Sequence, residues 1–241
     1  MTTSKQVSQQ QPSTSLITIP PTAQIEADWC DRPSVQVAPD LLGCTLVRQI
    51  PDDGPLIRAM IVETEAYAPG DPACHAYSGP SKRNAAMFGP PGQIYVYLIY
   101  GMYHCLNVVT EHSGIGSAVL IRALDLATVP PNIEAKQAQK PRRIAAGPGK
   151  LCRALDIDRT LDGKRYHPQN GLWLEQGRPL PATEEIVQTT RIGITKAAEQ
   201  PWRWYIKGNP AVSKKANSDR AKRTPTKRTP TKRTQKSFQS P

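Results

Sequence analysis

The sequence predicts a single mixed domain in which several β-strands are combined with short helices. Residues 94–99, IYVYLI, are apolar or aromatic without interruption, which is typical of a largely buried strand. Two further runs, at residues 56–67 and 117–124, have similar strand character. Both ends of the chain are expected to be disordered. The remaining residues 26–212, about 190 in number, are enough for one sizeable core.

Secondary structure along the chain is predicted from apolar runs, prolines and glycines. Strands are expected at residues 44–50, 56–67, 94–99, 102–109, 117–124, 172–174 and 204–207. Short helices are expected near residues 37–42, 133–139, 149–155 and 184–191. Tyr100 and Gly101 offer the turn of a β-hairpin, Pro148 can begin a helix, and residues 191–194 indicate a compact turn or strand.

The strand predicted at residues 56–67 carries acidic and aromatic side chains on one face. Because alternate side chains of a strand point the same way, Glu63, Glu65 and Tyr67 share a face. A solvated face is one interpretation, and it fits Glu63 better than a site does. The strand at residues 117–124 is apolar except for Arg122, and a buried arginine must pair or use its charge.

The predicted hairpin holds four of the chain's eight tyrosines. Strand alternation places Tyr95 and Tyr97 on one face. Tyr100 is expected near the tip, which is unusual because tips are wet and tyrosine gains most from burial. Composition alone favours four core tyrosines, and a binding role for some of them is the alternative.

The stretch before the hairpin, residues 68–92, is rich in glycine and proline. Loops of this length are uncommon in a compact domain unless they have a function. His75 is the only histidine in this loop, and Lys82 and Arg83 are well placed to meet phosphate. After the hairpin, Lys150 follows a glycine-rich turn that lacks the full Walker pattern. A helix N-terminus with Lys150 can still hold one phosphate.

Charge is concentrated at the C-terminal end of the chain. Residues 213–241 contain ten Lys or Arg and one Asp, which is +9 of the chain's net +11. This segment includes two copies of KRTPT, at residues 222–226 and 227–231, and it is expected to be disordered. A flexible cation of this density suits a polyphosphate backbone. We interpret it as a nucleic-acid arm, with a solubilising tail as the alternative.

Residues 1–25 are expected to be disordered and to carry no targeting signal. They lack an apolar core and contain no Arg, so neither a secretory nor a mitochondrial targeting peptide is indicated. No apolar run approaches membrane-spanning length. The five cysteines are odd in number and form no CxxC motif. Reduced thiols in an intracellular protein therefore fit better than a disulfide framework or a zinc site.

Several kinds of chemistry compete for the polar residues. A metal site at the Cys-His pairs is disfavoured because adjacent residues of a strand face opposite ways. Ser-His-Asp catalysis lacks the GxSxG elbow, and Glu63 and Glu65 on one strand cannot easily flank a sugar. One base beside stacked aromatic rings suits an enzyme that holds a planar heterocycle and activates water. Together with the basic tail, this pattern indicates a nucleobase taken out of the stack.

Residues 61–110, which include ETEAY and YGMYHCLN, closely resemble the 3-methyladenine (alkyladenine) DNA glycosylase family. The resemblance continues through AVLIRAL, GPGKLCRALDI, RIGI and YIKGNPAVS, so it covers essentially all of residues 31–213. It implies an α+β fold, a single mixed domain with a curved, mainly antiparallel β-sheet and packed helices. Cys74 stands where the family more often has Ser or Ala, and the KRTPT repeats lie outside the family pattern.

The resemblance also assigns roles residue by residue. It implies that Glu65 is the general base that activates water, and that Arg122 and the backbone carbonyl of Ile192 help to hold that water. The slot for the base would be lined by Tyr67, His75 and Tyr97. Asn107 would reject the exocyclic amine of normal guanine, and Tyr100 would fill the gap that the flipped nucleotide leaves in the duplex.

The function implied is that of a monofunctional DNA glycosylase in base excision repair. Its substrates would be alkylated or deaminated purines of the 3-methyladenine, 7-methylguanine, hypoxanthine and ethenoadenine class in double-stranded DNA. No cofactor, metal or membrane is implied. An intracellular monomer is expected, in the cytoplasm or nucleoid of a prokaryote or in the nucleus of a eukaryote. The rival from another class is a non-catalytic nucleic-acid-binding domain. Loss of Glu65 would favour this rival, but Glu65 is present.

Overall fold

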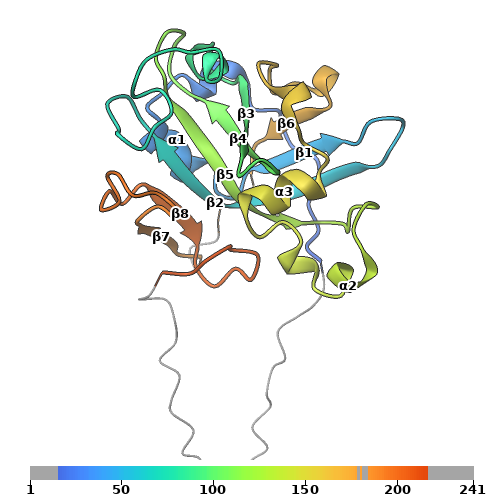
Figure 1. Ribbon diagram of the computed structural model, residues 1–241. Coiled ribbons are helices and arrows are strands. Elements are labelled where there is room, and N and C mark those ends of the chain that lie inside the picture. Colours follow the sequence, from blue (N-terminus) through green and yellow to red (C-terminus); the bar gives the residue numbers. More distant parts are fainter. Residues whose placement is uncertain (1–15, 178–179, 181–183, 217–241) are drawn as a thin grey trace, which may run out of the picture.

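The computed structural model describes residues 16–177, 180 and 184–216 of the 241-residue chain. Among these residues eight strands form one sheet in the order β3-β4-β5-β2-β1-β6, with β8 paired to β2 and β7 paired to β8. Every strand pair is antiparallel. The sheet curls, and a few short helices pack against it, as Figure 1 shows. The predicted α+β fold, a single domain with a curved antiparallel sheet, is confirmed.

The strands agree closely with those expected from the sequence. They are β1 (Thr45–Gln49), β2 (Leu56–Tyr67), β3 (Ile94–Ile99), β4 (Tyr103–Val109), β5 (Ala118–Leu126), β6 (Leu172–Glu175), β7 (Ile186–Thr189) and β8 (Arg203–Ile206). The α-helices are α1 (Ser34–Asp40), α2 (Ala135–Ala138) and α3 (Pro148–Ala154). Short 3₁₀ turns occupy Ala27–Cys30, Ala85–Phe88, Pro141–Arg143, Arg159–Leu161 and Pro168–Asn170.

One prediction of secondary structure is wrong. Residues 184–191 were expected to be helical, but Ile186–Thr189 forms β7 and pairs with β8, with Val187 opposite Tyr205. The exposure of β7 alternates along the strand, which is the period of an extended chain rather than of a helix. Pairing with β8 therefore outweighs the local helical propensity.

The long strand β2 organises the sheet. It pairs with β5 along most of its length, with β1 over its first half and with β8 at residues 63–65. Irregular register between Ile61 and Thr64 marks a β-bulge on the β5 side, and bulges bend a strand and increase its twist. Side chains from this strand and from β4 and β5, such as Ile61, Leu106 and Ile121, are buried in the main core with residues of α1 and α3.

The predicted hairpin consists of β3 and β4. Tyr100, Gly101 and Met102 connect them. Tyr100 and Gly101 have φ angles of 54° and 69°, and two residues with positive φ are what a type I′ hairpin turn requires. Pro148 begins α3 as predicted. This short helix packs against β4 and β5, so its first residues lie beside the hairpin (Figure 1).

The two ends expected to be disordered fall largely outside the described residues, which begin at 16 and end at 216. Residues 16–25 contact the sheet: the N–H of Ile25 donates to the carbonyl of Leu174 at 2.9 Å, and Thr22 N–H to Glu175 at 2.8 Å. At the other end, Ala216 N–H donates to the Tyr205 hydroxyl at 3.1 Å. Within the described part of the chain, no helix has the length and apolar character needed to cross a membrane.

Candidate active site

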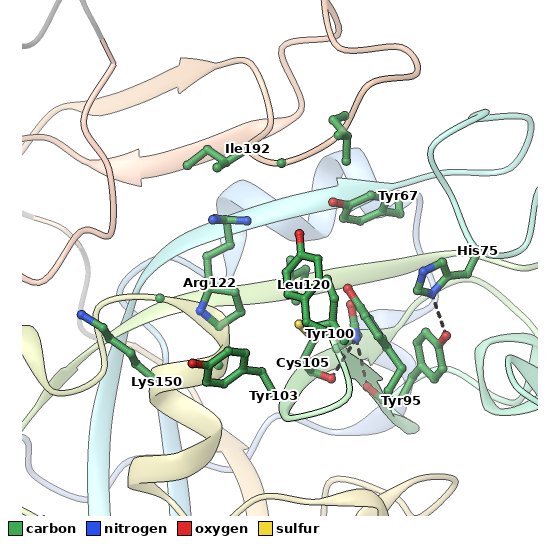
Figure 2. A pocket seen from close by; sticks show the side chains of 18 of the residues that line it. Tyr67, His75, Tyr95, Tyr100, Tyr103, Cys105, Leu120, Arg122, Lys150 and Ile192 are labelled. Atoms are coloured by element: carbon green, nitrogen blue, oxygen red, sulfur yellow. Dashed lines mark hydrogen bonds between the residues drawn. The ribbon is translucent and has the colours of Figure 1, made fainter.

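A pocket of about 570 Å³ opens between the β3–β4 hairpin, the C-terminal end of β2, β5, the start of α3 and residues 192–194. Figure 2 shows the aromatic side chains that converge on it. Eight of the predicted site residues line this pocket: Tyr67, His75, Tyr97, Tyr100, Asn107, Arg122, Lys150 and Ile192. The fold therefore gathers segments that are far apart in the sequence, such as those of Tyr67 and Ile192, which are separated by 125 positions.

Glu65 is fully buried behind three residues that line the pocket. The backbone N–H of Ile192 donates to its Oε1 at 2.7 Å, and the Tyr67 hydroxyl donates to its Oε2 at 2.9 Å. Nη1 of Arg122 lies 3.1 Å from the same Oε2 as an ion pair. In Figure 2 the Tyr67 hydroxyl points toward Arg122, whose guanidinium extends toward Ile192. The carboxylate is therefore held from three separate segments.

Burial and charge act in opposite directions on this carboxylate. Burial raises the pKa of Glu65, whereas Arg122, the Ile192 N–H and the Tyr67 hydroxyl lower it, and burial dominates. For Arg122, burial lowers the pKa of the guanidinium, but Glu65 and Glu63 raise it above its ordinary value. A carboxyl with a raised pKa accepts a proton more readily than an exposed one, which suits a general base.

The interpretation of Glu63 as a residue on a solvated face is wrong. Its side chain is fully buried, and Oε1 lies 2.9 Å from Arg203 Nη1 and 3.4 Å from Arg122 Nε. Oε2 accepts the backbone N–H of Ser213 at 2.7 Å. Because β5 and β8 flank β2 here, each neighbouring strand supplies an arginine, and the sequence of β2 alone could not reveal either partner.

The aromatic wall of the pocket is built by the hairpin and the loop at residues 68–92. The rings of His75 and Tyr97 meet edge to face, with centroids 4.5 Å apart. Nδ1 of His75 lies 2.8 Å from the hydroxyl of Tyr95, whose side chain is buried at the base of this wall. Tyr95 and Tyr97 are thus on one face of β3, as predicted, and Tyr95 both lines the pocket and supports His75.

Asn107 lies on β4 opposite Tyr95 and is buried. Its Nδ2 donates to the carbonyl of Tyr95 at 3.0 Å and reaches that of Cys105 at 3.4 Å. The amide is therefore fixed by the backbone of its own hairpin. It forms part of the pocket lining together with Cys105 and Leu120.

The residues predicted to meet DNA are all exposed, and two of them line the pocket. Tyr100 is 79% exposed at the hairpin tip, and the neighbouring Met102 is 67% exposed. Lys150 is exposed on α3 and lines the pocket. Lys82 and Arg83 are exposed in the loop but do not line the pocket.

Sequence reasoning missed Arg191. Its guanidinium is buried and paired with Asp71, with Nη2 3.0 Å from Oδ1, and it lies 4.8 Å from the centroid of the Tyr67 ring. It also donates to the carbonyl of Ala66 at 3.0 Å. Arg191 therefore ties the segment that carries Ile192 to the end of β2. No spacing or periodicity signals this pair, because its members are 120 positions apart.

All five cysteines are free and buried. In the part of the chain that the structure describes, no three His, Cys, Asp or Glu side chains gather closely enough to hold a metal ion. The pocket itself presents aromatic rings, His75 and the basic side chains of Arg122, Lys150 and Arg153, with the Glu65 carboxylate behind them.

Comparison with known proteins gives a consistent result. A sequence model of the methylpurine-DNA glycosylase family matches residues 28–210. A candidate 3-methyladenine DNA glycosylase of Synechococcus sp. (strain JA-3-3Ab) is 59% identical over 190 residues, which cover 77% of this chain and 97% of the relative. One from Trichodesmium erythraeum is also 59% identical, over 79% of this chain and 97% of the relative. A third, from Methanocella arvoryzae, is 49% identical over 80% and 96%.

Proposed function

The chain belongs to the methylpurine-DNA glycosylase family, and from this premise we propose how its pocket selects and releases a damaged base. As a member of this family it is an enzyme of DNA repair that hydrolyses N-glycosyl bonds of methylated purines such as 3-methyladenine. The proposal adds three steps. The lesion nucleotide is turned out of double-stranded DNA, its base enters the aromatic pocket, and Glu65 activates the attacking water.

The observation that carries the proposal is the buried carboxylate of Glu65 directly behind the pocket lining. Glu65 takes a proton from water while the water oxygen bonds to C1′ of the nucleotide. The bond between C1′ and the purine nitrogen breaks, and its electron pair leaves with the base. Arg122 and the carbonyl of Ile192 hold the water. A cationic purine is already a good leaving group, so one positioned base suffices.

The composition of the pocket supports selection of electron-poor purines. The ring faces of Tyr67 and Tyr97 attract a cationic base more strongly than a neutral one, and His75 completes the slot. Asn107 is fixed by two backbone carbonyls, so it cannot easily move aside for the exocyclic amine of normal guanine. The expected substrates are 3-methyladenine, 7-methylguanine, hypoxanthine and ethenoadenine. Damaged pairs also cost less to open, which adds selectivity before the chemistry.

The exposed side chains in and near the pocket support binding of duplex DNA. The protein is expected to bind as a monomer. Tyr100 at the exposed hairpin tip fills the space of the extruded nucleotide, and Lys82, Arg83 and Lys150 contact phosphates. Residues 213–241 add a cationic arm that binds the phosphate backbone of DNA. This arm follows the glycosylase domain of residues 26–212. The protein acts in the compartment that holds the genome, the nucleoid in a prokaryote or the nucleus in a eukaryote.

The deciding experiment measures base excision. Duplexes that each carry one of the four lesions are incubated with the protein, and abasic sites are cleaved with alkali. Strand cleavage at methylated purines, absent from an undamaged duplex, is expected. Tight binding of every duplex without cleavage would instead support the rival, a non-catalytic nucleic-acid-binding domain.

A further inference from the structure

A second acid shares the arginine of the active site. Arg122 lies between two carboxylates of β2, with Nε 3.4 Å from Glu63 and Nη1 3.1 Å from Glu65. Glu63 does not line the pocket, and of the described residues that do line it Glu63 contacts only Arg122, whereas Glu65 contacts Tyr67, Arg122 and Ile192. Any influence of Glu63 on the reaction is therefore indirect, through the position of Arg122 and through the electric field at Glu65.

Glu63 is itself held firmly. One of its oxygens faces both Arg122 and Arg203, and the other accepts the N–H of Ser213. Arg203 is fixed in turn, since Nε donates to the carbonyl of Thr190 at 2.8 Å and Nη1 to that of Lys214 at 2.9 Å. With both oxygens engaged, the Glu63 carboxylate has one position, and it faces the Nε edge of Arg122 as an ion pair at 3.4 Å, without a hydrogen bond to Nε.

The cluster balances its charge. Two carboxylates, Glu63 and Glu65, face two guanidinium groups, Arg122 and Arg203, and all four side chains are buried. Buried charges interact strongly because little water screens them. Removal of one charge from this cluster therefore changes the field at the remaining three.

Other groups near the cluster come from every element packed against it. Within α1 the only titratable side chain is Asp40, which pairs with Arg32 at the surface. Tyr67 on β2, Cys105 on β4 and Arg191 after β7 interact electrostatically with Glu65 or Arg122, and Arg203 lies over the ring of Tyr205 on β8. The helix α3, which packs against β4 and β5, carries Lys150, Cys152 and Arg153. Of these, only Tyr67 donates a hydrogen bond to Glu65 among the described residues.

We propose that Glu63 is a positioning residue, which orients Arg122 through the ion pair at Nε so that Nη1 pairs with Glu65. The negative charge of Glu63 also offsets the positive charge around the base. The proposal rests on the role of Glu65 as the base. Its consequence is electrostatic as well as geometric. Without the Glu63 charge, the excess positive charge stabilises the Glu65 carboxylate, which becomes a weaker base.

The experiment compares pH profiles of four variants in the full-length chain. Single-turnover excision of 7-methylguanine is measured against pH for Glu63→Gln, Arg203→Gln, the double variant Glu63→Gln/Arg203→Gln and the charge-keeping Glu63→Asp, with a melting curve for each. The acidic limb of the pH–rate profile, where the rate falls as Glu65 becomes protonated, should move to lower pH in Glu63→Gln and to higher pH in Arg203→Gln. It should return near the wild-type position in the double variant and stay there in Glu63→Asp.

The plateau rate adds an independent readout. Because Arg122 loses the partner of its Nε edge, the plateau should fall roughly tenfold in both variants that contain Glu63→Gln. A merely structural Glu63 would lower the melting temperature without moving the limb in opposite directions. The proposal is overturned if the acidic limbs of Glu63→Gln and Arg203→Gln stay at the wild-type position or move in the same direction. An unchanged plateau in the double variant overturns it even where a single variant does not fold.

Failure of this inference is separable from failure of the proposed function. If Glu65→Gln excises at the wild-type rate, Glu65 is not the base and Glu63 has nothing to position. If Glu65→Gln is inactive and the Glu63 and Arg203 variants leave the limb and the plateau unchanged, only the role of Glu63 is refuted.

Discussion

The backbone N–H of Ile192 donates a 2.7 Å hydrogen bond to Oε1 of Glu65, a residue 127 positions earlier in the chain. Ile192 belongs to an irregular segment between β7 and β8, so the sheet does not fix it directly. Its neighbour Arg191 does, through Asp71 and the carbonyl of Ala66. The placement of the buried carboxylate thus depends on an ion pair outside the pocket.

Replacement of Asp71 by Asn tests this dependence. The change leaves the buried guanidinium of Arg191 without its carboxylate, which typically costs about 3–5 kcal/mol of stability. We also expect the excision rate to fall at least about tenfold at a temperature where the variant is folded, because Ile192 loses its fixed position. Thermal melting and single-turnover excision measure the two effects. Asp53→Asn, in an exposed turn with φ of 56°, is the control and should change neither; wild-type excision by folded Asp71→Asn would contradict the dependence.

Replacement of Glu65 by Gln tests the base itself. The amide keeps the shape of the side chain but cannot accept the proton from water, so excision should fall by at least about a hundredfold. Binding to a duplex with an abasic-site analogue should persist, because Glu65 does not line the pocket. Glu134→Gln, at an exposed position whose side chain caps no helix, is the matched control. Near wild-type turnover of Glu65→Gln would remove this residue from its role.

The pH dependence of excision follows from burial. Burial raises the pKa of Glu65 above the usual range of a glutamate, which is about 4.3 when unperturbed. The base works when ionised, so the rate should be constant at high pH and should fall as the pH drops through the raised pKa. A 7-methylguanine duplex is the suitable substrate, since methylation at N7 makes the base a leaving group without the need for a proton on N7. A rate that stays constant down to the ordinary carboxylate range contradicts this expectation.

The sequence predicts local structure well because local patterns determine it here. The alternation of β2, the glycine at the hairpin turn and the proline at the start of α3 each act over a few residues. The helix predicted at residues 184–191 is wrong because the structure there is determined by a distant segment: β7 is a strand through its pairing with β8.

The site divides in the same way. Motif resemblance finds the residues that line the pocket, from Tyr67 to Ile192, because they lie within short characteristic strings. It does not find the partners of Glu63 or the pair of Asp71 and Arg191, which arise only when strands and loops distant in sequence meet. A strand pattern gives the side on which Glu63 lies, but not whether another layer covers that side.

Truncation tests the cationic arm. Because residues 213–216 bond to Glu63, Arg203 and Tyr205, the cut belongs after Ala216. Deletion of residues 217–241 removes eight basic residues and one acidic residue. Non-specific DNA affinity should drop and its dependence on salt should flatten, while single-turnover excision at saturating protein should barely change. Unaltered binding at low salt would show that these residues are not a DNA arm.

The hairpin tip offers the clearest separation of stability from function. Tyr100 is 79% exposed and has a φ of 54°, a conformation that asparagine adopts more readily than tyrosine. Tyr100→Asn should therefore keep or slightly raise the melting temperature. It should nevertheless reduce excision from a stable duplex strongly, because no ring fills the space of the extruded nucleotide, an effect worth a few kcal/mol at most.

Tyr97→Ala is the contrasting variant. Its ring packs against His75 and Tyr95, so truncation should cost stability, up to about 3–5 kcal/mol for a fully buried aromatic residue, and should weaken selectivity among lesions. Melting curves are recorded beside a flipping assay with a fluorescent base analogue for both variants. If Tyr100→Asn melted well below the wild type and still flipped the analogue normally, the tip tyrosine would be a structural residue. The space of the extruded nucleotide would then have to be filled by the other exposed side chains of the tip, Met102 and Tyr103.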